Sequence, residues 1–302
     1  KARVAAGARR VYADYREMLE RERPELVSVA PRWSEEHHPM VRAALEAGAH
    51  VYCEKPFTRT LAEADDLLAV AQVAGRRIAV AHQGRLSPAT LALKARLDAG
   101  EFGELREIRV HGKQDRRAGG EDLLVLGTHQ FDLVRFFAGE PLWCTARILQ
   151  GQREAAVGDA RAATEGIGPV LGDAIDAFLA LPRGVAVHYT SRAGHAAASG
   201  PWGMELICAR GRLRLLNDPI TQVFVARDAN AGADAWRRRD WKPLAPDLAG
   251  PMAVRGGQDL ANRRVVDDWL AAIAERREPA CSGFAAMKSL EVIHAILRAG
   301  LT

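Results

Sequence analysis

The first third of the chain alternates short apolar runs with amphipathic segments, and this alternation limits the fold more than any other feature. Helical patterns span residues 36–48 and 60–75, each with a suitable capping signal at one or both ends. The apolar runs have the continuity of strands buried on both faces, and they are Leu26–Ala30, His50–Cys53 and Arg77–Ala81. Strands and helices in this order, joined by short links, predict a parallel, doubly wound sheet.

Beyond Gly103 the pattern changes to strands of alternating polarity joined by tight turns. The expected strands are residues 105–112, 173–181, 185–191, 204–208 and 212–216. Helices expected over Asn262–Arg276 and Phe284–Leu297 would cover one face of their sheet. The predicted fold class is therefore α/β, with an incomplete Rossmann-type parallel sheet followed by an α+β domain with a large, mostly antiparallel open sheet. The boundary falls near Arg85, which gives domains 1–84 and 85–302.

Composition excludes several classes of function. The net charge is +4, but the basic residues occur mostly as scattered pairs interleaved with acids, which favours solvated surface over a nucleic-acid interface. Neither a membrane-spanning apolar run nor a signal peptide is recognisable, so we expect a cytoplasmic protein with no membrane partner. The four cysteines lie far apart without metal-ligand spacing, so we expect free thiols and no metal site.

A dinucleotide-binding unit normally opens with a glycine-rich turn, whose amides hold the pyrophosphate at a helix N-terminus. Nothing before Val27 supplies such a turn, so we expect the first strand and its glycine loop to precede Lys1. The glycine-rich segment Gly166–Gly172 is followed by an alternating β pattern and not by a helix. It is interpreted as a turn in the second domain.

Several ordered motifs resemble the glucose-fructose oxidoreductase, inositol dehydrogenase and rhizopine-catabolism family, called Gfo/Idh/MocA. The motifs are Val27–Pro31, His37, Ala44–Val51, the loop Glu54-Lys55-Pro56, Gly127–Asp132, Phe136–Gly139, Gly211–Leu213 and Pro279–Glu291. The resemblance covers essentially the whole chain. It implies an NAD(P)-dependent oxidoreductase that transfers a hydride to or from a hydroxyl or carbonyl carbon of a small sugar- or polyol-like substrate. It also implies a homo-oligomer paired through the outer face of the second sheet.

The resemblance assigns catalytic roles to Lys55 and His129. Lys55 would stabilise the alkoxide that forms as hydride leaves carbon, and His129 would act as general base or acid. Asp132, one helical turn beyond His129, would bind a substrate hydroxyl or orient the histidine. The alternatives from the residues alone are an exposed surface lysine, a core histidine and a helix-surface carboxylate. The predicted substrate-binding residues are therefore Lys55, His129 and Asp132.

The cofactor, NAD or NADP, is expected to lie against two loops and one helix. The predicted cofactor-binding residues are Ala30, Pro31, Arg32, His37, Glu54, Lys55 and Pro56. Arg32 is equally compatible with contact to a phosphate, contact to an acidic substrate, or simple solvation.

The chain departs from the family pattern at two places. Pro31 and Arg32 replace the family's Thr-Pro turn, and Val125 replaces the aspartate four residues before the histidine, with Asp122 off register. Val125 leaves open a non-catalytic ligand-sensing or scaffold protein with the same fold. A third hypothesis, suggested by some family relatives, is glycoside cleavage through a transient NAD-dependent oxidation.

Overall fold

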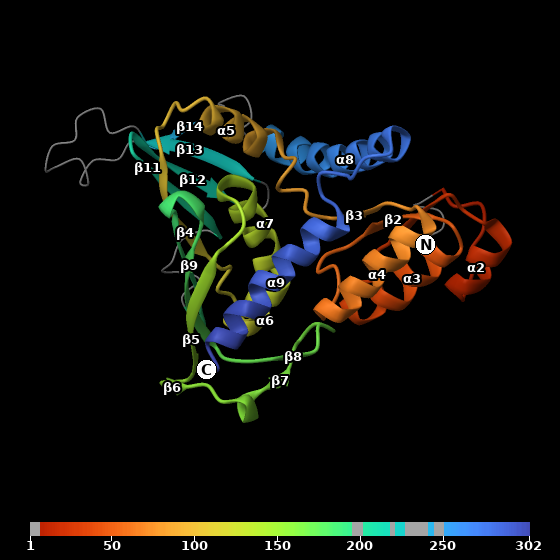
Figure 1. The fold of residues 1–302 in the computed structure, drawn as a ribbon, viewed down its shortest axis with the longest axis horizontal. Coiled ribbons are helices and arrows are strands. Elements are labelled where there is room, and N and C mark those ends of the chain that lie inside the picture. Colours follow the sequence, from red (N-terminus) through yellow and green to blue (C-terminus); the bar gives the residue numbers. More distant parts are fainter. Residues whose placement is uncertain (1–6, 195–201, 218–220, 227–240, 245–250) are drawn as a thin grey trace, which may run out of the picture.

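A small parallel sheet forms the N-terminal part of the computed structural model, which describes residues 7–194, 202–217, 221–226, 241–244 and 251–302. Its strand order is β1-β2-β3, with every pairing parallel, as predicted. The strands are β1 (Leu26–Val29), β2 (His50–Cys53) and β3 (Ile78–Val80). The helices of this part are α2 (Tyr15–Glu22), α3 (His37–Glu46) and α4 (Leu61–Ala74), with a short 3₁₀ turn at Ser34–Glu36. Figure 1 shows α3 and α4 together on one side of these strands.

Local sequence explains where α4 begins and ends. The Thr60 side chain accepts a hydrogen bond from the Glu63 backbone, and the Glu63 carboxylate accepts one from the Thr60 backbone. The helix ends at Gly75, whose φ of 64° is the left-handed conformation that glycine adopts without a steric penalty. Its buried side chains, which include Leu67, pack in the N-terminal core. The predicted caps of this helix are confirmed.

The first strand differs from the expectation of burial on both faces. Val29 is buried, but Leu26 is 44% exposed. β1 pairs with β2 along its whole length, and no other strand in the described chain pairs with its second edge. An apolar run cannot be shielded from water where neighbouring elements cover only one side, so β1 is an edge strand here.

A nine-stranded mixed sheet organises the second part of the chain. Its order is β14-β13-β12-β11-β4-β10-β9-β5-β6, and only the β4–β10 pairing is parallel, so the predicted open and mostly antiparallel sheet is confirmed. The strands are β4 (Leu105–His111), β5 (Trp143–Gln150), β6 (Arg153–Glu154), β9 (Ala174–Ala180), β10 (Ala186–Arg192), β11 (Gly203–Cys208), β12 (Gly211–Leu216), β13 (Gln222–Ala226) and β14 (Lys242–Pro243). A separate ribbon pairs β7 (Arg161–Ala162) with β8 (Pro169–Val170).

Helices cover one face of the large sheet and bury the main core. They are α5 (Pro88–Asp98), α6 (Gly120–Val125), α7 (Gly127–Ala138) and α9 (Gly283–Ala299). In Figure 1, α6, α7 and α9 lie between the large sheet and the N-terminal elements. Phe131 of α7 packs on Tyr189 of β10, with 5.3 Å between ring centroids. The helix α7 therefore lies between the large sheet and the N-terminal part.

The expectation for the helix at 262–276 was wrong. That segment belongs to α8 (Pro251–Glu275), whose main contacts with strands, among the described residues, are with β2 and β3 of the small sheet. Trp269 is buried, with its ring 6.1 Å from the ring of Tyr52 on β2. Just beyond α8, the Val80 backbone N–H donates to the Cys281 carbonyl at 2.8 Å. C-terminal residues therefore complete the packing of the N-terminal sheet, because its exposed apolar face needs a cover.

Two further expectations can be compared with the structure. All four cysteines are free thiols, as predicted, and three of them are buried. Across the described residues, no helix has both the length and the apolar character needed to traverse a bilayer.

The close approach of α6 to the segment before β9 yields a stability prediction. A Cβ on Gly120 would lie 2.2 Å from the Leu171 carbonyl oxygen, whereas one on Gly158 would meet nothing within 4 Å. Gly120→Ala should lower the free energy of unfolding by about 1–3 kcal/mol, because the backbone must shift to admit a methyl group. Gly158→Ala, the control, should change it little. Equal urea midpoints for the two variants would contradict this packing.

Candidate active site

Three loops meet at one edge of the small parallel sheet. Ala30–Arg32 follows β1, Glu54–Pro56 follows β2, and Ala81–His82 follows β3. Because the carboxyl ends of parallel strands lie at the same edge, the polar groups of these loops converge. This edge faces α6 and α7 of the second part, since the Lys55 ammonium donates to the Val125 carbonyl at 3.2 Å.

Lys55 is partly buried, which excludes the alternative of a freely exposed surface lysine. Burial lowers the pKa of its ammonium, opposed by the charges of Glu54 and Glu165 and assisted by Arg117. A lysine ammonium has three N–H donors, and the described structure shows one of them in use, to Val125. Lys55 therefore retains hydrogen-bonding capacity for a ligand at the sheet edge.

His129 lies in the first turn of α7, at the margin of the core. Its ring packs edge-to-face with His82 at 5.5 Å and with Trp202 at 6.1 Å between centroids. Burial lowers the pKa of His129 well below its ordinary value, and the positive charge of Lys55 lowers it further. The residue nevertheless retains some exposed surface, so it is not a fully enclosed core histidine. The structure thus brings His129 and Lys55, from different parts of the chain, into one electrostatic environment.

Asp132 is 1% exposed, so the alternative of a helix-surface carboxylate was wrong. Arg85 forms a two-pronged ion pair with it: Nη2 lies 2.5 Å from Oδ1, and Nε lies 3.0 Å from Oδ2. The Asp132 carbonyl also accepts from Arg85 at 3.2 Å. Both carboxylate oxygens are engaged by Arg85, and the nearest described histidine nitrogen is Nδ1 of His82, at 3.7 Å from Oδ1.

His37 has no exposed surface and joins two of the three loops. Its Nδ1 lies 2.8 Å from the Pro56 carbonyl oxygen, and its Nε2 lies 3.1 Å from that of Pro31. The ring therefore links the loops after β1 and β2 through both of its nitrogens.

Arg32 is the most accessible of the predicted cofactor residues that carry charge. Its side chain is 69% exposed, and its guanidinium lies over the Trp33 ring at 4.9 Å from the centroid. It also lies 3.8 Å from Glu165, a residue of the second part of the chain. An exposed arginine that is only loosely paired can still reach an anionic group.

The structure shows what occupies the position of the family's aspartate. The Val125 side chain is buried, and its backbone oxygen is the Lys55 acceptor. Asp122 accepts hydrogen bonds from the Ser191 hydroxyl at 2.5 Å and from the Gln114 backbone at 3.1 Å. Asp122 therefore anchors α6 to the large sheet and does not substitute for the missing carboxylate at Lys55.

Sequence reasoning missed two features of the site. His82 is buried at the end of β3, where the strand-end rule alone would have placed it beside Lys55. The Gly166 carbonyl accepts from the Glu35 backbone and from the Ser34 hydroxyl, both at 3.2 Å. The segment expected to be a turn within the second domain thus also reaches the N-terminal part. A side chain at Gly166 would strike Trp33, which explains the glycine.

The buried ion pair between Arg85 and Asp132 gives a prediction about stability. Arg85→Met should lower the free energy of unfolding by about 3–5 kcal/mol, because it leaves the Asp132 carboxylate buried without a counter-charge. The double variant Arg85→Met/Asp132→Leu should be more stable than Arg85→Met, since no orphan charge remains. Chemical denaturation of the single and double variants measures this coupling. Additive losses would show that the two side chains do not interact.

Comparisons with known proteins agree with this architecture. A family model described as "Oxidoreductase family, NAD-binding Rossmann fold" matches residues 1–82, and one described as "GFO/IDH/MocA C-terminal domain" matches residues 90–214. Uncharacterized oxidoreductase YdgJ of Escherichia coli (strain K12) is 42% identical over 83 residues, covering 28% of this chain and 24% of the relative. D-apiose dehydrogenase of Paraburkholderia graminis is 32% identical over 146 residues, covering 45% and 39%. The matched region thus spans less than half of these curated relatives.

Solved structures share the fold over nearly the whole chain. Levoglucosan dehydrogenase, crystallised in complex with NADH and levoglucosan, superposes with a TM-score of 0.75 at 20% identity, covering 99% of this chain and 84% of that one. The two family models together match more than half of the chain, in the order of its two sheets. The chain belongs to the Gfo/Idh/MocA oxidoreductase family.

Proposed function

We propose that the protein is an NAD-dependent oxidoreductase that transfers a hydride to or from a hydroxyl or carbonyl carbon of a sugar- or polyol-like small molecule. The observation that carries the proposal is the meeting of Lys55 and His129 at the carboxyl edge of the parallel sheet. Both nitrogen-bearing groups are partly buried, and both keep hydrogen-bonding capacity within the described structure. Such a pair can handle the charge and the proton of an alcohol undergoing oxidation.

The residues present fit the nicotinamide end of a dinucleotide. The loops after β1 and β2 offer Ala30, Pro31 and Arg32 on one side and Glu54, Lys55 and Pro56 on the other, while His37 holds them together. Lys55 supplies free ammonium donors between these loops. A bound nicotinamide would accept or donate the hydride. The family description and the NADH complex of levoglucosan dehydrogenase support NAD as the cofactor.

Lys55 and His129 have different roles toward the substrate. In oxidation, His129 takes the hydroxyl proton, and the Lys55 ammonium stabilises the negative charge on oxygen while the carbon loses its hydride. In reduction, Lys55 polarises the carbonyl oxygen and His129 returns the proton. Burial strengthens both interactions, because water no longer screens the developing charge.

Relatives and neighbours support the substrate class. D-apiose dehydrogenase and levoglucosan dehydrogenase are named for sugars or sugar derivatives. A cytoplasmic location and pairing of subunits through the outer face of the large sheet remain part of this proposal.

A second candidate function is ligand sensing without catalysis. The observation that favours it is Val125, whose apolar side chain leaves Lys55 with a carbonyl acceptor and not a carboxylate. Such a protein would bind the cofactor or a sugar without any change in nicotinamide absorbance. The same assays therefore decide between the two functions.

Lys55→Met tests the catalytic proposal directly. In an assay of NADH formation with a panel of aldoses and polyols that includes D-apiose and levoglucosan, the variant should lose activity by about 100-fold or more. Its thermal midpoint should not fall, because methionine removes a partly buried charge. Lys94→Met is the matched control, since Lys94 pairs with Asp98 on the helix α5. Undiminished turnover in Lys55→Met would overturn the assignment.

Val125→Asp tests the charge state of Lys55. Burial lowers the pKa of Lys55, so its ammonium is present below that pKa and is lost as pH rises through it. A carboxylate at position 125 should raise this pKa, and the alkaline limb of kcat/KM should move to higher pH by about one unit. Val125→Asn, which has nearly the same shape and no charge, should leave the limb in place. An unmoved limb in Val125→Asp would show that Lys55 is not the titrating group.

A further inference from the structure

A short segment of the second part of the chain contacts the turn that follows the loop after β1. This segment, Thr164–Gly166, lies in the connection between β7 and β8, which extends toward the N-terminal helices in Figure 1. The Gly166 carbonyl oxygen accepts from the Glu35 backbone N–H and from the Ser34 hydroxyl, both at 3.2 Å. Ser34 is 1% exposed, so its hydroxyl relies on a protein acceptor and not on water. We call Thr164–Gly166 the clasp.

The clasp is anchored in the second part of the chain at three points. Glu121 of α6 has no exposed surface, and its carboxylate accepts from the Thr164 backbone N–H at 2.9 Å and from the Thr164 hydroxyl. The Glu165 carboxylate pairs with Arg117 at 3.0 Å. Ile167, the next residue, is buried in the core of the second part. The clasp therefore moves with α6 and the large sheet, although its outer side contacts the N-terminal part.

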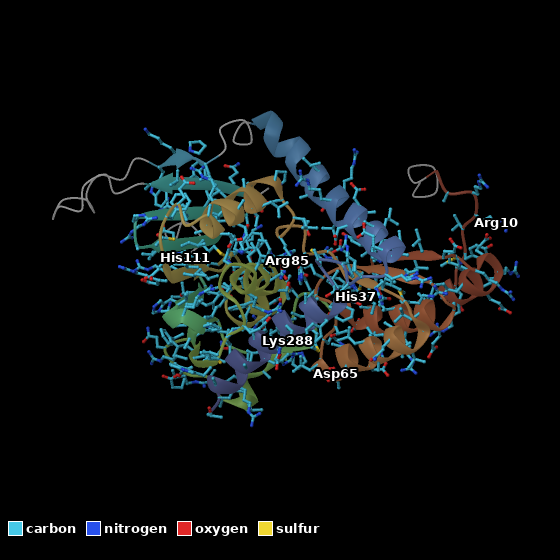
Figure 2. The ribbon with its side chains drawn as sticks, turned by 45° about the horizontal axis from the view of Figure 1, so that its top comes forward. Arg10, His37, Asp65, Arg85, His111 and Lys288 are labelled. Atoms are coloured by element: carbon cyan, nitrogen blue, oxygen red, sulfur yellow. The ribbon has the colours of Figure 1, made fainter. Side chains whose placement is uncertain are left out.

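The clasp contacts the loop that is expected to line the nicotinamide. Residues 30–32 of that loop lead into the turn Ser34–Glu36 and then into His37. His37 holds the loop from within the N-terminal part, at the Pro31 carbonyl, whereas Gly166 holds the turn from the second part. Figure 2 shows His37 on the side of the N-terminal elements that faces the large sheet. The loop is thus held from both parts of the molecule.

The contact between the clasp and the turn is too close to admit a side chain at Gly166. A Cβ there would lie 2.8 Å from the Trp33 Cβ and 3.3 Å from the carboxyl carbon of Glu35. Gly166 is not among the glycines with positive φ, so its backbone conformation is open to other residues. The glycine is therefore required by the contact itself and not by the local backbone.

We propose that the clasp positions the cofactor loop: by holding the Ser34–Glu36 turn against the second part, it keeps the loop after β1 in the conformation that receives the nicotinamide end of the dinucleotide. This inference rests on the proposed function, because it assumes that the loop binds a nicotinamide cofactor. A loop that is already ordered does not lose conformational freedom when the cofactor binds. Without the clasp, the apparent affinity falls by the fraction of time that the loop spends in other conformations.

Gly166→Ala tests the clasp, because a methyl group is the smallest side chain that separates it from Trp33. In a fluorescence titration of the full chain with NADH, its Kd should rise about tenfold, as expected if the loop holds the binding conformation about a tenth of the time. The KM for NAD should rise in parallel, while kcat at saturating NAD stays within about twofold. Gly158→Ala is the matched control. Gly158 lies between β6 and β7, and a Cβ there would meet nothing within 4 Å.

Hydrogen exchange without cofactor tests the contact independently of activity. The Glu35 amide, which donates to the Gly166 carbonyl, should exchange about tenfold faster in Gly166→Ala and at the original rate in Gly158→Ala. If circular dichroism shows that Gly166→Ala is unfolded, Ser34→Ala replaces it. Ser34→Ala removes only the hydroxyl bond to the clasp, so the exchange rate and the Kd should shift in the same direction by smaller factors.

The two measurements together decide the proposal. Faster exchange of the Glu35 amide combined with a raised Kd for NADH supports it. Either change without the other, or neither, overturns it, because the contact would then not serve cofactor binding. In those cases NADH binding by the unmodified protein leaves the proposed function intact. If the unmodified protein itself binds no NADH, the proposed function and this inference both fail.

Discussion

The buried ion pair between Arg85 and Asp132 is the interaction on which the rest of the site depends. Arg85 lies in the link between β3 of the parallel sheet and α5, and Asp132 lies on α7, so the pair holds this link against α7. Lys55 is carried by one part and His129 by the other. Because the pair is almost fully buried, loss of one partner would leave a charge that water cannot reach. The pair thereby helps to hold the link between the two parts next to α7, the helix that carries His129.

Burial also sets the chemistry at this junction. It is the largest cause of the lowered pKa values of Lys55, His82 and His129. These three groups share one poorly solvated space, in which each positive charge opposes the others. The Lys55 ammonium is stabilised by its hydrogen bond to the Val125 carbonyl, and His129 avoids the repulsion by remaining neutral. The valine in place of the family's aspartate therefore removes a charge but not the hydrogen-bond acceptor.

Sequence patterns predicted the features that local chemistry controls, and they failed where distant segments compete for the same surface. The caps at Thr60 and Gly75, the strands that were expected and the mostly antiparallel sheet follow from nearby residues, whereas β5 and β13 were not expected. The placement of α8 against β2 and β3 does not, because an amphipathic helix can cover either sheet. His37 and Asp132 were expected at the ligand, but their partners, Pro31, Pro56 and Arg85, could be identified only in three dimensions. No sequence motif marks His82, although the sequence places it just after an expected strand.

The most direct test of the account is the position of the nicotinamide ring in a crystal structure of the full chain with NADH. The account predicts that the ring lies between the loops after β1 and β2, with the Lys55 ammonium and the His129 imidazole facing the carbon that carries the hydride. An ordered nicotinamide ring away from both side chains would contradict the account, whatever the fold of the chain.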